Sequence, residues 1–101
     1  MEINCKKNLL PIGSVVTIRF NNDVKLMITG YSPVDSKTNK VYDYMAVIYP
    51  YGFDSYDNTM VFDRDVIKKV HYVGFKTDDY QSIEELARDS IEKYKNSNKQ
   101  D

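Results

Sequence analysis

The stretch from Leu10 to Tyr31 constrains the fold most, because apolar and polar residues alternate along it in two runs. Side chains on a β-strand point alternately to opposite faces, so each run predicts a strand with one apolar side. The intervening Asn21-Asn22-Asp23 predicts a tight turn, since Asn and Asp tolerate the left-handed backbone that such turns need. The stretch therefore predicts a β-hairpin. Its apolar sides are Val16, Ile18 and Phe20 in the first strand and Val24, Leu26 and Ile28 in the second.

Three further segments have the character of strands. Val41–Tyr49 is apolar on both faces, which is typical of a strand covered on both sides or placed inside a sheet. Thr59–Phe62 predicts a short strand, and Ile67–Phe75 predicts the last one. Between these two segments, Asp63-Arg64-Asp65 predicts a single helical turn or a tight turn, with Asp63 as a candidate cap.

The C-terminal part predicts a helix over 82–95. Ser82 and Glu85 have the spacing of a capping box, in which each side chain binds the other residue's backbone amide. Packing of the helix on its own sheet is the simpler interpretation of its apolar stripe, and docking onto another protein is the alternative. The stripe contains Ile83, Leu86, Ala87, Ile91 and Tyr94, whereas the opposite face contains the four-apart pairs Glu84–Arg88 and Asp89–Lys93.

These elements predict an α+β fold, a small and strongly twisted antiparallel sheet or partial barrel of about five strands with one C-terminal amphipathic helix. A chain of 101 residues is expected to form one domain. We expect a flexible lead-in over 1–9, a single domain over 10–95 and a frayed tail over 96–101. Within the domain, the β-rich part spans 10–75 and the helix spans 82–95.

Composition restricts the classes of partner. The formal net charge of −1 gives no positive field, which argues against nucleic acid as a partner. No stretch approaches the roughly 20 apolar residues that span a bilayer, so no membrane partner is expected. Residues 1–8 lack the apolar run of a signal peptide. The single cysteine, Cys5, excludes an intrachain disulfide, which fits a reducing cytosol or a compartment where disulfides are unnecessary. Of these, we expect a cytoplasmic location.

Residues that carry chemistry are sparse. His71 is the only histidine, and its place between Val70 and Tyr72 favours a half-exposed sheet residue over a catalytic one. Asp54 and Asp57 lack the alternating ligands and the glycine of a calcium loop, and the glycines form no phosphate-binding motif. We therefore predict no enzyme activity, with no catalytic, cofactor-binding or metal-binding residues and no cofactor. An enzyme would require His71 to meet carboxylates in a pocket.

Aromatic residues make up 13% of the chain, with nine tyrosines and no tryptophan. Many of them lie between Tyr42 and Tyr56, interleaved with aspartates. A stacking platform for single-stranded nucleic acid would need a positively charged groove, so these aspartates argue against one. Exposed aromatic side chains are also typical anchors of protein interfaces. The predicted partner-binding residues are Tyr49, Tyr51, Phe53, Tyr56, Leu86, Ile91 and Tyr94.

Four strings occur in order, LPIGSVV at 10–16, KLMITGY at 25–31, YDY at 42–44 and YPYG at 49–52. Together they resemble a small domain-of-unknown-function family encoded in Gram-positive type VII secretion loci, beside LXG polymorphic toxin genes. The resemblance covers roughly Leu10 to Phe75. Family members often carry glycines at the hairpin turn, where this chain has Asn21-Asn22-Asp23.

This resemblance implies a non-catalytic accessory protein, without established catalytic residues. Such a protein is expected to bind its cognate secreted LXG toxin in the cytoplasm as an adaptor or chaperone before export. Two alternatives remain open at this point. One is an immunity protein that neutralises such a toxin, and the other is a small nucleic-acid-binding β-barrel.

Overall fold

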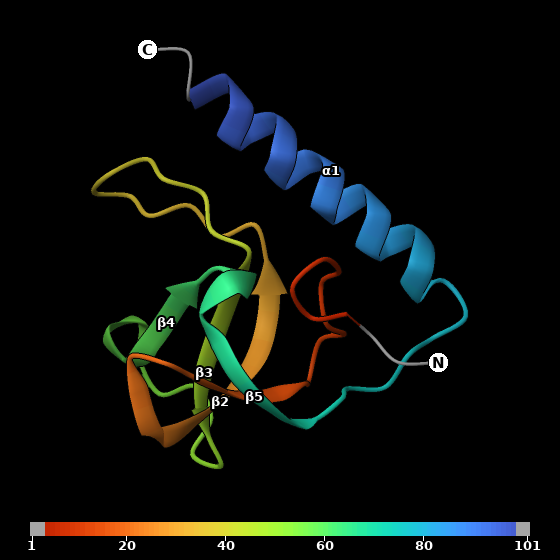
Figure 1. The fold of residues 1–101 in the computed structure, drawn as a ribbon. Helices are drawn as coiled ribbons and strands as arrows, with labels where there is room; N and C mark the ends of the chain where they lie inside the picture. The colour runs from red at the N-terminus through yellow and green to blue at the C-terminus, as the bar shows by residue number, and fades with distance from the viewer. Residues whose placement is uncertain (1–3, 99–101) are drawn as a thin grey trace.

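The computed structural model describes residues 4–98 and contains, within them, one five-stranded antiparallel sheet and one α-helix (Figure 1). Single turns of 3-10 helix, η1 (Tyr56–Asn58) and η2 (Arg64–Val66), precede the last two strands. The predicted α+β class, with a twisted sheet and a C-terminal helix, is confirmed. The elements are β1 (Val15–Ile18), β2 (Asn21–Tyr31), β3 (Tyr44–Tyr49), β4 (Thr59–Phe62), β5 (Ile67–Tyr72) and α1 (Tyr80–Asn98).

The sheet has the strand order β4-β3-β2-β1-β5, so the last strand pairs with the first. All neighbouring strands are antiparallel, and the pairing register shifts at several points, for example between Ile28 and Gly30 on β2. Such irregularities increase the local twist of a sheet. The sheet therefore curls around its apolar face, although β4 and β5 do not pair to close it.

The core lies on one face of the sheet, where side chains alternate as the sequence predicts. Leu9 and Leu10 close it from the N-terminal side, and Ile91 reaches it from α1. Burying an aliphatic side chain completely stabilises the fold by about 1.5–3 kcal/mol. The strands contribute Val16, Ile18, Leu26, Ile28, Tyr44, Ala46, Phe62 and Ile67 to this core.

The turn between β1 and β2 lies earlier than predicted. Ile18 pairs with Asn21, so Arg19 and Phe20 form the turn and Asn21-Asn22-Asp23 begins β2. The backbone amide of Arg19 donates to the carbonyl of Val66 at 3.0 Å, which holds the end of β1 against η2. The prediction that Phe20 joins the apolar face is therefore wrong, because its side chain is 73% exposed at the turn.

Helix α1 starts before the predicted capping box and extends past the predicted end at residue 95. The amide of Tyr80 donates to the carbonyl of Thr77, and the amide of Ile83 donates to that of Asp79. Ser82 and Glu85 consequently lie inside the helix and not at its cap. Residues 96–98, expected in the frayed tail, are helical, and 99–101 lie outside the described residues.

The predicted lead-in is attached to the domain over the part that the structure describes. Its first three residues lie outside that part. The amides of Lys7 and Asn8 both donate to the carbonyl of Asn4, which forms a turn. The ammonium group of Lys6 donates to the carbonyl of Ile67 at 2.9 Å, and Leu9 is completely buried. The packed domain thus begins before residue 10.

Candidate functional site

The loop between β3 and β4 presents the aromatic residues that the sequence singles out. Tyr49 ends β3, while Tyr51, Phe53 and Tyr56 follow it, and all four side chains are exposed. The rings of Phe53 and Tyr56 meet edge to face with their centroids 5.4 Å apart. We call these four residues the aromatic loop, which offers anchor side chains at one end of the sheet.

Helix α1 turns a side of mixed character toward the rest of the domain and so divides its predicted apolar stripe, because Ala87 packs against the core beside Ile91 while the other members stay exposed. Glu84 is 3% exposed and Ile91 is 1% exposed, whereas Leu86 is 72% exposed. Ile83 and Tyr94 are exposed too, and we call Ile83, Leu86 and Tyr94 the outer stripe. Of the three helix residues predicted to bind a partner, Leu86 and Tyr94 are accessible. Ile91 belongs to the core and is not accessible to a partner in this conformation.

Glu84 explains this orientation of the helix. Its Oε2 atom accepts hydrogen bonds from the backbone amide of Leu9 at 2.9 Å and from Nε of Arg88 at 2.8 Å. Burial alone would raise the pKa of this carboxyl group, but the bonds from Arg88 and Leu9 outweigh burial and lower the pKa. The carboxylate is therefore charged where it attaches α1 to the N-terminal segment, beside which the helix lies in Figure 1.

A second ionic cluster attaches the other end of α1. The ammonium group of Lys95 donates to Asp43 at 3.2 Å and to Asp63 at 3.0 Å. Asp43 is buried, and it also accepts from the backbone amide of Arg64 at 2.7 Å and from Nε of Arg64 at 3.0 Å. Burial lowers the pKa of Lys95, but Asp63 and Asp43 outweigh burial and raise it. Asp63 starts the predicted turn, yet its carboxylate binds Lys95 and the amide of Asp43 instead of capping η2.

Tyrosine hydroxyls bind the backbone of Leu9 and Leu10. The amide of Leu10 donates to the hydroxyl of Tyr44 at 2.7 Å, and the hydroxyl of Tyr31 donates to the carbonyl of Leu10. The hydroxyl of Tyr80 donates to the carbonyl of Leu9, whose amide is bound by Glu84. Burial raises the pKa of these tyrosines and keeps them protonated. Part of the tyrosine surplus is therefore structural.

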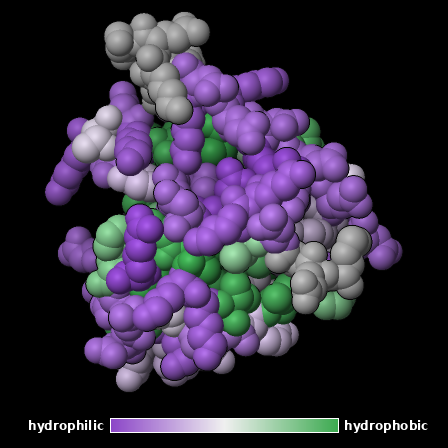
Figure 2. Space-filling model, in the orientation of Figure 1, coloured by the Kyte–Doolittle hydropathy of each residue, from purple (hydrophilic) through white to green (hydrophobic). Residues whose placement is uncertain are grey.

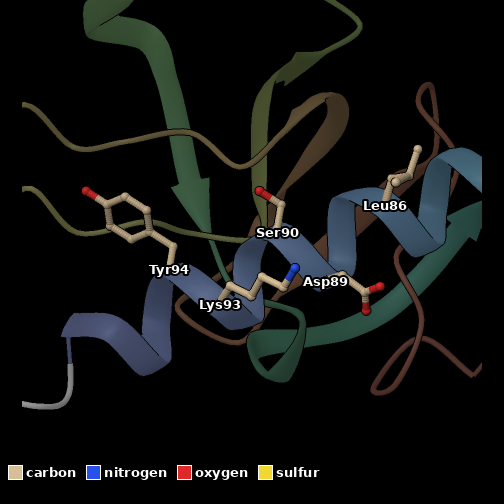
Figure 3. A pocket seen from close by; sticks show the side chains of 5 residues that line it. All are labelled: Leu86, Asp89, Ser90, Lys93 and Tyr94. Carbon is tan, nitrogen blue, oxygen red and sulfur yellow. The ribbon is translucent and has the colours of Figure 1, made fainter.

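The outer stripe borders a shallow hollow on the exposed side of α1. Figure 3 shows Leu86, Ser90 and Tyr94 projecting from the same side of the helix, with Asp89 and Lys93 beside them. Two apolar side chains and the small Ser90 thus form a surface with one acid and one base at its border. A surface of this kind fits an apolar side chain of a partner.

Apolar side chains are exposed again just after β5. Gly74 is buried, and its amide donates to the hydroxyl of Ser14 at 2.9 Å. A Cβ atom at this position would collide with the carbonyl of Ile12, so only glycine fits. Its neighbours Val73 and Phe75 are exposed. More generally, Figure 2 shows hydrophobic side chains open to solvent in the middle of the visible face, within a largely hydrophilic surface.

His71 lies on β5 with an exposed side chain. Its Nε2 atom is 2.6 Å from the hydroxyl of Thr17 on β1, which makes a hydrogen bond between neighbouring strands. Desolvation and the positive charges of Lys25 and Lys69 lower the pKa of the imidazole. Among residues 4–98, no three His, Cys, Asp or Glu side chains are grouped to hold a metal ion.

The fold and the surface thus define the class of protein. It is a small α+β domain with an open sheet, an ionically attached helix and exposed aromatic side chains. A family model described as Domain of unknown function (DUF4176) matches residues 9–83, and the chain belongs to this family. No curated protein and no solved structure matches it. The family match ends inside α1, before Glu84. In the part of the chain that the structure describes, no helix is both long and apolar enough to cross a membrane.

Proposed function

We propose that this protein is a non-catalytic accessory protein that binds another polypeptide through the outer stripe and the aromatic loop. The observation that carries the proposal is the orientation of α1, which buries Glu84 and leaves Leu86 in solvent. Apolar side chains that a folded helix leaves exposed together are typical of interaction sites. The aromatic loop adds Tyr51 and Tyr56, a residue type enriched among interface anchors.

The proposed partner is a cognate LXG toxin, bound in the cytoplasm of a Gram-positive bacterium before export by type VII secretion. Support for this partner comes from the four ordered strings between residues 10 and 52, which resemble a family encoded beside such toxins. The protein would then act as an adaptor or chaperone that accompanies the toxin to the secretion machinery.

Copurification tests this function. The tagged protein is coexpressed with the LXG toxin encoded next to its gene, and toxin recovery is compared between two variants of α1. Leu86→Glu adds a charge to the outer stripe, whereas Gln81→Glu adds the same charge at an exposed position outside it. We expect Leu86→Glu to weaken binding about tenfold or more, since anchors dominate interface energies. The proposal is contradicted if the toxin does not copurify with the wild-type protein, or if both variants recover equal amounts of toxin.

A second measurement separates an adaptor from an immunity protein. The toxic domain of the LXG protein is expressed alone in cells, with and without this protein. An adaptor leaves the toxicity unchanged because it binds the toxin for export. Full rescue of growth would instead assign this protein to immunity.

A further inference from the structure

The sheet carries a groove on its outer face, opposite the core. Val16 and Leu26 point into the core, so Val15 and Lys25 point to the other face, because neighbouring side chains on a strand alternate. The strand pairing brings Val15 next to both Met27 and Tyr72. Four adjoining strands, β3, β2, β1 and β5, thus contribute to one groove of about 470 Å³. Its lining residues are Gly13, Val15, Lys25, Met27, Tyr49, His71 and Tyr72.

The groove has an apolar floor and aromatic sides. Val15 is buried and Met27 is half-buried between the strands, whereas Tyr49 and Tyr72 are exposed on either side. Methionine adapts its shape to different apolar groups, and tyrosine offers a large apolar surface with a polar tip. An apolar side chain of a ligand would therefore be covered on several sides.

The border of the groove is positively charged. Lys25 is an exposed lining residue that carries this charge, and Lys69 is close enough to influence the protonation of His71. Because the pKa of His71 is lowered from 6.5, its imidazole is a neutral hydrogen-bonding group at pH 7 and the positive charge comes from the lysines. Among the described residues that line the groove, none is acidic. A lysine ammonium group is a compact point charge with three donors, so it can pair with the carboxylate of a ligand from many directions.

We propose that this groove binds a segment of the partner polypeptide in which apolar side chains alternate with carboxylates. The apolar side chains pack on Val15 and Met27, and the carboxylates pair with the ammonium groups of Lys25 and Lys69. That the ligand is a polypeptide rests on the proposed function. The groove lies on the sheet face away from the core to which α1 is attached, and Tyr49 belongs both to its lining and to the aromatic loop. The groove would therefore extend the contact surface of the aromatic loop and be separate from the outer stripe.

A titration followed by NMR tests the groove on the whole protein. The probe is a short synthetic peptide that alternates leucine with glutamate, and the matched peptide has lysine in place of each glutamate. We expect the acidic peptide to shift the amide signals of Gly13, Lys25 and His71, and to bind more weakly as salt is added. The lysine peptide is expected to leave these signals unchanged. Equal binding of both peptides, or shifts confined to α1, overturns the proposal.

Two variants check the assignment. Lys25→Glu reverses a charge at the groove and is expected to weaken binding of the acidic peptide about tenfold. Lys37→Glu makes the same change in the loop before β3, outside the lining, and is expected to leave binding unchanged. Because both lysines are exposed, the amide spectrum of each variant should show an intact fold. Equal effects of the two changes contradict the assignment.

The toxin itself distinguishes failure of the groove from failure of the proposed function. If the wild type retains the toxin and Lys25→Glu retains it equally, the groove is not part of the interface and the proposed function stands. If the toxin fails to copurify while the acidic peptide binds in the groove, the proposed function fails and the chemistry of the groove stands.

Discussion

The strands and the helix contact the same core through different groups. Strands β1 and β2 contribute aliphatic side chains such as Val16 and Leu26, whereas α1 contributes Ile91. Ala87 packs beside Ile91, and the helix is further attached by ionic and hydrogen-bonded contacts through Glu84 and Lys95. Apolar burial has no preferred direction, but hydrogen bonds and ion pairs need a defined geometry. Apolar packing thus dominates the contacts that the strands make with the core, whereas hydrogen bonds and ion pairs fix the orientation of the helix.

This difference has a functional consequence. A helix attached only by its apolar stripe would cover that stripe. Because Glu84 and Lys95 determine how α1 is turned, Leu86 and Tyr94 remain available to another protein. The comparison also predicts that the two regions respond differently to substitution, pH and salt.

Truncating one leucine in the sheet and one on the helix should give the largest difference in the free energy of unfolding. Leu26→Ala removes a side chain that is 1% exposed, and we expect a loss of about 2–5 kcal/mol in the free energy of unfolding. Leu86→Ala is the matched change on the outer stripe, and we expect it to stay within about 0.5 kcal/mol of the wild type. Urea unfolding measures both values. Similar losses would show that Leu86 is packed in solution.

Removing the buried carboxylate of α1 should cause the second-largest loss in the free energy of unfolding. Glu84→Ala leaves the amide of Leu9 and the guanidinium of Arg88 without their partner. We expect a loss of about 2–3 kcal/mol, below the range for a fully buried pair, because Arg88 reaches solvent. Glu85→Ala, at an exposed neighbouring position, is the control and should have little effect. If both changes cost the same, the direction of α1 is not set by Glu84.

Protonating Glu84 should cost less than deleting it, because a neutral carboxyl still accepts the amide of Leu9. The pKa of Glu84 in the folded state lies below its ordinary value of 4.5. Its contribution to stability is therefore present above pH 4.5 and is lost as the pH falls through the folded-state pKa. The stability difference between wild type and Glu84→Gln should narrow in acid, as measured by urea unfolding at several pH values. If this stability difference stays the same at every pH, the charge of Glu84 does not contribute to the stability of the fold.

At alkaline pH, the free energy of unfolding should depend on the buried tyrosine hydroxyls that bind Leu9 and Leu10. Burial raises the pKa of Tyr31 and Tyr44 above the ordinary value of 10.0. Their contribution is present below pH 10 and is lost as the pH rises further, because the unfolded chain releases these protons first. Tyr44→Phe should reduce this alkaline loss of stability, and Tyr42→Phe, at a residue with no such bond to Leu9 or Leu10, should leave it unchanged.

Short-range patterns predicted much of the fold. Local sequence patterns identified all five strands, and the segment Thr59–Phe62 matches β4 at both ends. The predicted strand Val41–Tyr49 begins three residues before β3, and Ile67–Phe75 extends three residues past the end of β5. The turn after β1 was misplaced because the amide of Arg19 binds Val66, a contact that the local preference of asparagine for turns does not reveal. Strand patterns are local, whereas this turn is fixed by a residue distant in sequence.

The surface of α1 could not be predicted from periodicity. The three- and four-residue steps place Ile83, Leu86 and Ile91 on one apolar stripe. In the structure, Glu84 binds Leu9, and Lys95 binds two aspartates from other segments. These contacts turn the helix so that Ile91 faces the core while Leu86 faces solvent. One signal was present in the sequence. Asp43 sits within an apolar run, and a buried acid requires a cationic partner.

Removing Lys95 should give the smallest effect and the most local one. Its side chain is partly exposed, and Asp43 keeps its bonds to Arg64 when Lys95 is replaced. We therefore expect Lys95→Ala to cost about 1 kcal/mol or less, and less still in high salt. Amide hydrogen exchange should quicken in the last turns of α1 while the amides of β2 stay protected.

Lys93→Ala is the control for this last change, because Lys93 is exposed on the same helix and does not belong to the ionic cluster that Lys95 and Arg64 form with Asp43. Equal exchange in the two variants would mean that the cluster around Asp43 does not hold the end of α1. Faster exchange throughout the sheet would mean that the helix and the strands unfold as one unit. Either result would remove the difference between the two regions on which the accessibility of Leu86 and Tyr94 depends.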